Sequence, residues 1–382
     1  MERRPEGESH RLPKPDHYDH YKDAQPYGLR IHVHGGEIYG ESTGWLEYQV
    51  FKATPATKGP LWEYRRLVDA AQFPGKFSND IAMFNWPGND YRDVPPVDRP
   101  ADVLASALQD AKRVSLGFAY WLQTDALNPD TVRGFPHLRI RPDVMGTADG
   151  LSKHPYIREC RRIVALKTII EQEIAVAHQP GPRATRFHDS VGVGWYPIDI
   201  HQVSADKVGT STRTRPFQIP MGALIPRRVE NLLAANKNIG TTHITNGCFR
   251  LHPVEWNIGE AAGLAAAFAV NHKRSPRATR EDPKLLRMYQ DELLSEGVPL
   301  CWLIDVPVQN SDFASIQRMV IDRGFGGEDA GLEFKPNQPV SGNARIAWSE
   351  GPEHSRRSYS THDAAVTRGE FAVALATSGQ PE

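Results

Sequence analysis

The sequence predicts a mixed α/β fold for most of the chain, with an α+β domain beside it. Short extended patterns, such as residues 27–33 and 217–219, alternate along the chain with helical patterns such as residues 102–122. The chain has 382 residues, of which 40% are hydrophobic, so it can bury one large core or two smaller ones.

Composition excludes several classes of protein. The formal net charge of −1 provides no basic field for nucleic acid and no polybasic membrane patch. No stretch approaches the ~18 continuous apolar residues of a membrane span. The first residues lack the apolar core of a signal peptide, so we expect a cytoplasmic protein. The three cysteines, Cys160, Cys248 and Cys301, have no CxxC spacing and are expected to be reduced thiols, with no metal site.

The first part of the chain contains one clear helix. Residues 1–25 are charged and aperiodic, which predicts a flexible tail. Residues 27–33 and 37–51 suit strands, and residues 61–69 suit a short helix. Residues 102–122 place apolar side chains at helical spacing, which predicts an amphipathic helix.

Two polar segments are candidate ligand-binding sites. Residues 85–91, Asn-Trp-Pro-Gly-Asn-Asp-Tyr, form a turn that combines aromatic, amide and carboxylate groups, as in sites that hold sugars. An aromatic-anchored turn is the alternative. In an extended segment Asp199 and His201 point to the same face, as a general base and its orienting carboxylate would. A structural His–Asp pair is the alternative there.

The stretch of residues 215–270 is the most informative part of the sequence. Its pattern predicts a short strand at 217–219, a buried strand at 231–235, a polar loop, and an apolar helix starting close to Ile258. Gly259 and Gly263, four apart, permit close approach of another backbone or a flat ligand. Because residues 261–270 have no polar face, we expect the helix to be enclosed. Its free N–H groups at the start would attract negative charge.

This stretch resembles the closing segment of the FAD-dependent oxidoreductases of the glutathione-reductase-like superfamily. The matching residues are Asn238, Ile239, Gly240, Thr242, His243, Gly247, Arg250, Pro253, Gly259, Glu260, Ala261, Ala262 and Gly263. So many matches in order are more specific than a lone glycine pattern. The resemblance implies a FAD cofactor and an incomplete FAD/NAD(P)-binding fold of the glutathione-reductase type beside an α+β substrate domain.

The resemblance also implies roles for individual residues. His243 and Arg250 are expected near the flavin ring or the substrate, with His201 as a further catalytic candidate. The cofactor-binding candidates are Ile239, Gly240, Gly259, Glu260, Ala261 and Ala262. The implied reaction is hydride transfer from a small organic substrate to FAD, with sugars among the substrates considered. The segment Glu159-Cys160-Arg161-Arg162 matches a run that lies near the flavin and the substrate entrance in the family, and a structural arginine paired with Glu159 is the alternative.

No strand followed by GxGxxG occurs in the sequence, although this motif normally seats the FAD pyrophosphate. Three explanations are open: a truncated flavoenzyme, half of a split enzyme whose glycine-rich FAD-binding segment is separate, or a non-catalytic binding or packing module. The expected domains are a tail at 1–25, a substrate or cap domain at 26–185, the C-terminal part of a flavin-binding domain at 186–298, and an appendage at 299–382. This appendage weakly resembles an S-layer-homology repeat.

Overall fold

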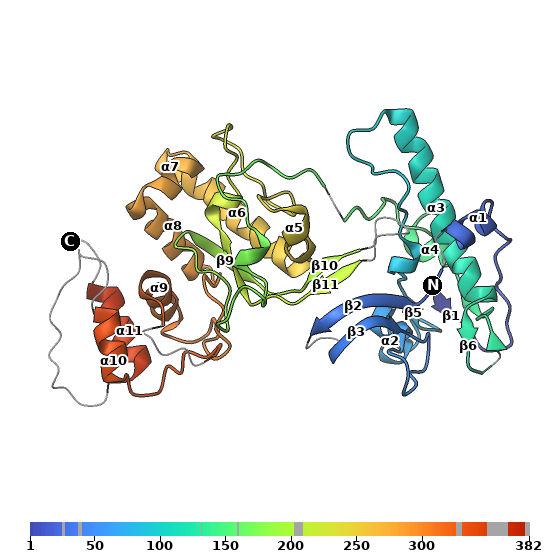
Figure 1. Cartoon of the computed structure of the whole chain (residues 1–382), viewed down its shortest axis with the longest axis horizontal. Helices are drawn as coiled ribbons and strands as arrows, with labels where there is room; N and C mark the ends of the chain where they lie inside the picture. Colours follow the sequence, from blue (N-terminus) through green and yellow to red (C-terminus); the bar gives the residue numbers. More distant parts are fainter. Residues whose placement is uncertain are drawn as a thin grey trace. The chain divides into compact units, whose positions relative to one another are not determined.

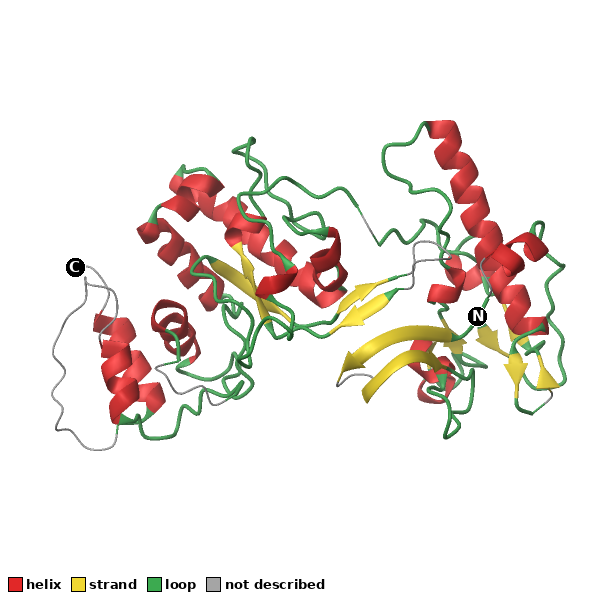
Figure 2. Ribbon diagram, viewed as in Figure 1, coloured by secondary structure: helices red, strands yellow, loops and turns green. Residues whose placement is uncertain are grey.

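The computed structural model describes residues 1–24, 27–36, 40–130, 132–158, 160–201, 209–325, 331–349 and 366–378. The chain forms two compact units, each a mixture of helices and small sheets (Figures 1 and 2). Unit 1 comprises Met1–Ile157 and Ile200–Ser211, and unit 2 comprises Arg158–Asp199 and Thr212–Glu382. The predicted mixed α/β class therefore agrees with the structure, and the predicted domain bounds at 186 and 299 stay predictions.

Unit 1 contains a four-stranded sheet in the order β4-β5-β1-β8, in which each pair is antiparallel, and the two-stranded sheets β2-β3 and β6-β7. Its strands are β1 (Glu2–Arg3), β2 (Arg30–Gly36), β3 (Gly40–Glu47), β4 (Arg66–Val68), β5 (Ile81–Ala82), β6 (Leu127–Asn128), β7 (Val132–Arg133) and β8 (Leu138–Arg139). Its helices are α1 (Tyr18–Ala24), α2 (Leu61–Arg65), η1 (Ala70–Gln72), η2 (Pro87–Asn89), α3 (Ala101–Thr124) and α4 (Pro142–Met145).

Helix α3 organises the core of unit 1 and confirms the helix predicted at residues 102–122. Its buried face contributes Val114, Phe118 and Leu122 to a cluster rich in aromatic side chains. Phe118 contacts Trp121 with ring centroids 5.6 Å apart and contacts Tyr27 at 6.1 Å. Aromatic side chains bury large apolar areas, so this cluster supplies much of the stability of the unit.

The first residues are ordered, which differs from the predicted flexible tail. Strand β1 pairs with both β5 and β8, and α1 packs against α3. Tyr18 and Tyr21 are buried, and the Tyr18 hydroxyl donates to Asp125 Oδ2 at 2.8 Å. The prediction failed because these side chains bind partners far along the chain, such as Asp125, which the composition of the first residues does not reveal.

Unit 2 contains the antiparallel pair β9 (Ser190–Gly194) and β12 (Phe217–Pro220). The pair β10 (Ile198–Ile200) and β11 (Thr210–Thr212) belongs to both units. The helices of unit 2 are η3 (Glu171–Glu173), η4 (Met221–Ala223), α5 (His243–Phe249), α6 (His252–His272), α7 (Pro276–Glu281), α8 (Pro283–Ser295), α9 (Phe313–Arg323), α10 (Gly342–Ser349) and α11 (Arg368–Ser378).

Helix α6 packs on the β9-β12 sheet and on α8. The Asn257 side chain accepts a hydrogen bond from the Val193 amide at 2.8 Å, and the Tyr289 hydroxyl of α8 donates to the Ala261 carbonyl at 2.6 Å. A Cβ atom on Gly192 would lie 2.1 Å from Asn257 Oδ1, so the close approach of helix and strand requires glycine there.

The predicted start of this helix at Ile258 is wrong. Helix α6 begins at His252, and Pro253 lies in its first turn, where a missing N–H costs nothing. The prediction that it is enclosed is also wrong. Ala261, Ala265 and Phe268 are buried, whereas Val270 is 76% exposed and Trp256 is 77% exposed. Alanine and glycine on the outer face carry too little apolar surface to force burial.

A further segment differs from its prediction. Residues 231–235 form no strand, and Leu232 is 49% exposed. This prediction failed because a short apolar run fits a strand, a helix or an irregular segment equally well. Residues 160–170 are irregular, with isolated bridges from Ala165 to Pro226 and from Ile169 to Thr241.

The C-terminal residues pack as part of unit 2. Trp348 is fully buried and stacks on Phe334 and Phe371 at centroid distances of 5.9 and 6.0 Å. Residues 350–365 lie outside the described residues, and the resemblance to an S-layer repeat stays a prediction. No helix in the described part of the chain is long and apolar enough to span a bilayer.

Candidate functional site

The loop that leads from Ile239 towards α6 is held by hydrogen bonds from the backbone and side chains of neighbouring segments. The Gly240 amide donates to the Ala223 carbonyl at 2.8 Å, and its carbonyl accepts from the Ile169 amide at 2.9 Å. Thr242 caps α5, accepting from the Thr245 amide at 3.1 Å. Both predicted cofactor-binding residues at the start of the loop, Ile239 and Gly240, are buried.

Gly240 serves as a packing position. A Cβ atom there would lie 2.3 Å from the Lys167 carbonyl oxygen and 2.5 Å from the Ala165 side chain. The match to the family pattern at this position therefore has a structural cause that needs no ligand.

The other predicted cofactor-binding residues lie two turns inside α6. Ala261 and Ala262 are buried, Glu260 is exposed, and Gly259 approaches the Ala235 carbonyl, with 3.3 Å from a built Cβ atom to that oxygen. Their amide groups follow the first turn, whose free N–H groups begin at His252. The prediction that Gly259 opens the helix is corrected, and contact of these residues with a cofactor stays a prediction.

Four buried polar atoms around this loop have no hydrogen-bond partner among the described residues. They are Thr241 Oγ1, Asn246 Oδ1, Arg250 Nε and Glu255 Oε1. An unsatisfied buried polar atom costs about 1–3 kcal/mol, so folded proteins rarely keep several in one segment. These groups offer donors in the Thr241 hydroxyl and the Arg250 guanidinium and an acceptor in the Asn246 amide oxygen, which suits a polar ring with both donor and acceptor groups. We call Thr241, Asn246, Arg250 and Glu255 the polar loop set.

Arg250 is the only permanent charge of the polar loop set, and it is 4% exposed. Its Nη2 atom donates to the Asp199 carbonyl at 2.9 Å and lies 3.5 Å from Asp199 Oδ2. Asp199 was predicted to orient His201, and the structure pairs it with Arg250 in unit 2. His243, the third predicted catalytic residue, lies exposed at the first position of α5.

Burial raises the pKa of Glu255 above its ordinary value, although Lys237, His252 and Arg250 oppose the shift. Loss of hydration outweighs the three positive charges because the carboxyl is partly buried beside the helix start. Glu255 therefore holds its proton to higher pH than a solvated glutamate does.

His201 belongs to unit 1, where it pairs with Asp90. The distance from His201 Nδ1 to Asp90 Oδ2 is 2.6 Å, and the two side chains are 18% and 13% exposed. Such a carboxylate fixes the ring orientation and favours the tautomer with the proton on Nδ1. The sequence predicts His201 as a candidate base but does not reveal Asp90 as its partner, because 111 residues separate the two.

Asp90 follows the 3-10 helix η2 within the turn at residues 85–91. Packing and hydrogen bonds hold this turn rigidly. The Trp86 ring is 3% exposed and contacts Tyr48 at a centroid distance of 4.9 Å. Asn89 Oδ1 accepts from the Trp86 amide at 3.0 Å, and a Cβ atom on Gly88 would lie 2.5 Å from the Gly28 carbonyl oxygen. Trp86 is thus a core residue, as the alternative of an aromatic-anchored turn expects.

Three comparisons with known proteins bear on these sites. A family model described as FAD dependent oxidoreductase matches residues 16–293, which include the Asp90–His201 pair and the polar loop set. No curated protein and no solved structure matches the chain. In the described residues, no group of three or more His, Cys, Asp or Glu side chains is placed to hold a metal ion.

A packing role for Gly240 predicts that Gly240→Ala destabilises the folded chain, because the Lys167 carbonyl must move. We expect a loss of about 1–3 kcal/mol in urea-induced unfolding. Gly263→Ala is the matched control: its Cβ atom meets nothing within 4 Å, so it should stabilise the helix by about 0.5–1 kcal/mol. Equal stability of the two variants would contradict the packing role.

The raised pKa of Glu255 predicts a pH-dependent effect of Glu255→Gln. The folded state favours the neutral carboxyl, so its contribution is present in acid and lost as pH rises through the raised pKa. The permanently neutral Gln should raise the melting temperature at about pH 8 and leave it nearly unchanged at about pH 4. Glu260→Gln, at an exposed position on the same helix, controls for loss of one charge. A stabilisation that is larger in acid would exclude this account.

Proposed function

Because the chain belongs to the FAD dependent oxidoreductase family, we propose that it oxidises a small organic molecule by hydride transfer to FAD. The Asp90–His201 pair carries this proposal: removing a hydride from an alcohol or amine carbon requires a base that takes the remaining proton. Sugars and related alcohols are the proposed substrates, since they present several such carbons.

The polar loop set supports FAD as the group that unit 2 receives. The ring of FAD carries carbonyl oxygens and ring nitrogens, and the loop presents unpartnered donors and acceptors in Arg250, Asn246 and Thr241. Bound FAD supplies the electron-accepting chemistry. The buried guanidinium of Arg250 is held by the Asp199 carbonyl and stabilises negative charge nearby in a low dielectric environment.

His201 takes the substrate proton in this mechanism. When Nδ1 donates to Asp90, the Nε2 lone pair is the basic site, and Asp90 stabilises the imidazolium that forms. The rigid turn at residues 85–91 holds Asp90 in place because Trp86 and Gly88 are locked into the core of unit 1. His243 is proposed as a further polar group toward substrate.

A separate glycine-rich FAD-binding segment is the proposed partner for the nucleotide half of the cofactor. The outer face of α6 supports this: Trp256 and Val270, 14 residues apart, are exposed with Gly263 between them. Leu232 and Val229, in the irregular segment ahead of the polar loop, are also about half exposed at 49% and 45%. Large apolar side chains on a small-residue helix face are typical of a docking surface.

The proton-transfer role predicts that His201→Gln lowers kcat by about 10²- to 10⁴-fold when the chain is assayed with the glycine-rich FAD-binding segment, FAD and a sugar alcohol as substrate. Asp90→Asn should lower it less and shift the acid limb of the pH–rate profile, because the neutral amide no longer stabilises the imidazolium. His154→Gln, at an exposed position in unit 1, is the control. Full turnover by His201→Gln and by Asp90→Asn, with FAD absorbance unchanged, would reject His201 as the base.

The partner proposal predicts that a GxGxxG βαβ segment from another member of the family copurifies with this chain and brings yellow flavin absorbance. Trp256→Glu and Val270→Glu together should abolish both, since each places a charge in the apolar contact. Met288→Glu, on the exposed face of α8, is the control. Flavin binding by the chain alone, or copurification that survives the double substitution, would refute this docking surface.

A further inference from the structure

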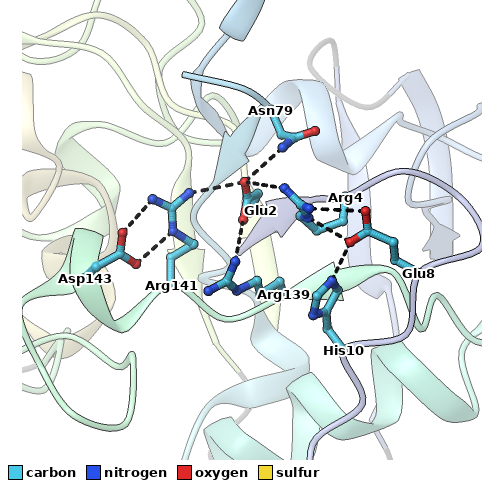
Figure 3. A network of polar contacts seen from close by, with 8 residues as sticks. All are labelled: Glu2, Arg4, Glu8, His10, Asn79, Arg139, Arg141 and Asp143. Atoms are coloured by element: carbon cyan, nitrogen blue, oxygen red, sulfur yellow. Dashed lines mark hydrogen bonds and ion pairs between the residues drawn. The ribbon is translucent and has the colours of Figure 1, made fainter. Parts of the chain in front are cut away.

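A buried carboxylate in unit 1 gathers three arginines (Figure 3). Glu2 lies in β1, opposite Arg139 of β8 in the sheet register, and is 4% exposed. Its Oε1 atom lies 3.3 Å from Arg141 Nη1 and 3.8 Å from Arg4 Nη1, and Oε2 lies 3.9 Å from Arg139 Nη1. One carboxylate cannot neutralise three guanidinium groups, so the cluster needs further negative charge.

Two of the three arginines also form an ion pair with a second carboxylate. Arg4 Nε donates to Glu8 Oε2 at 2.9 Å, and Arg141 Nη2 donates to Asp143 Oδ2 at 2.6 Å. The hydrogen bond from Arg141 lowers the pKa of Asp143 to about 2, so this carboxyl is charged at neutral pH. Among the described residues, Arg139 has no ion pair other than the 3.9 Å contact with Glu2, and its side chain is 48% exposed.

A cavity of about 220 Å³ opens beside these groups. It is lined by the following residues: Glu2, Arg4, Lys76, Phe77, Ser78, Arg139, Arg141 and Asp143. Lys76 is exposed, and in the described part of the chain it forms no ion pair. The cluster holds four cations, Arg4, Lys76, Arg139 and Arg141, and three carboxylates, Glu2, Glu8 and Asp143. The two cations without a short ion pair, Lys76 and Arg139, both line the cavity. Its volume is below the ~300–1,000 Å³ of drug-sized pockets, which suits a small ligand.

We propose that this cavity binds an oxyanion, the phosphate or carboxylate group of a small metabolite, between Arg139 and Lys76. The guanidinium donates a planar pair of N–H groups to two oxygens, and the ammonium adds a point charge. The Ser78 hydroxyl on the lining is a further donor. Glu2 positions the arginines and makes no contact with the anion, because its oxygens already face Asn79 and the three guanidinium groups. This site is independent of FAD and of the reaction proposed above.

Calorimetric titration of the full chain with inorganic phosphate, glucose 6-phosphate and D-gluconate tests the site, with glucose as the uncharged control. We expect saturable binding of at least one anion, weakened by salt, and none of glucose. Arg139→Gln with Lys76→Gln should weaken it by about tenfold or more, since two charge-assisted contacts are lost. Both positions are exposed, so the fold should persist by circular dichroism.

Arg99→Gln with Lys52→Gln is the matched control, because it removes the same charge from exposed positions that do not line the cavity. The control should bind within about twofold of the unsubstituted chain. Tighter binding of glucose 6-phosphate than of gluconate would identify a phosphate ligand, and the reverse would identify a carboxylate; either supports the site. Absence of saturable anion binding, or equal weakening by both double variants, would overturn it.

Discussion

The hydrogen bond from the Val193 amide to Asn257 Oδ1 holds α6 against strand β9, and the polar loop depends on this contact. On the partner strand of the same small sheet, Phe217 of β12 stacks on Phe249 at the end of α5, with ring centroids 4.3 Å apart. Both helices are therefore fixed to one sheet, and the residues between them have little freedom. The packing of α5 and α6 on this sheet therefore fixes the backbone of Arg250, and its side-chain hydrogen bonds to Asp199 add to that.

The sequence predicted elements best where apolar spacing was long and unambiguous. Helix α3 was predicted within two residues at each end, because a 24-residue helix repeats its spacing many times. The start of α6 was missed by six residues, since Pro253 was treated as a turn outside the helix and in fact occupies the first turn. Residues 231–235 were predicted as a buried strand, although a five-residue apolar run does not identify the surface that would bury it.

The candidate site could be predicted by residue type but not by pairing. Asp199 and His201 do alternate on an extended segment, yet Asp199 bonds with Arg250 and His201 bonds with Asp90. Local periodicity determines which side chains share a face, and only tertiary packing determines what lies opposite that face. The same reason explains Glu2, whose arginine partners are Arg139, in the strand β8 that pairs with β1, and Arg141, two residues after the end of that strand.

The two units use buried charge in different ways, and this difference bears on function. In unit 1, the Glu2 carboxylate is surrounded by cations and its charge is more than compensated. In unit 2, Arg250 is 4% exposed, with a carbonyl as its closest partner and a carboxylate oxygen only at 3.5 Å. Because a buried guanidinium with incomplete compensation is costly, folding alone gives little reason to keep it. The proposed FAD would supply such a reason, since the charge of Arg250 would stabilise a nearby ring that becomes more negative on reduction.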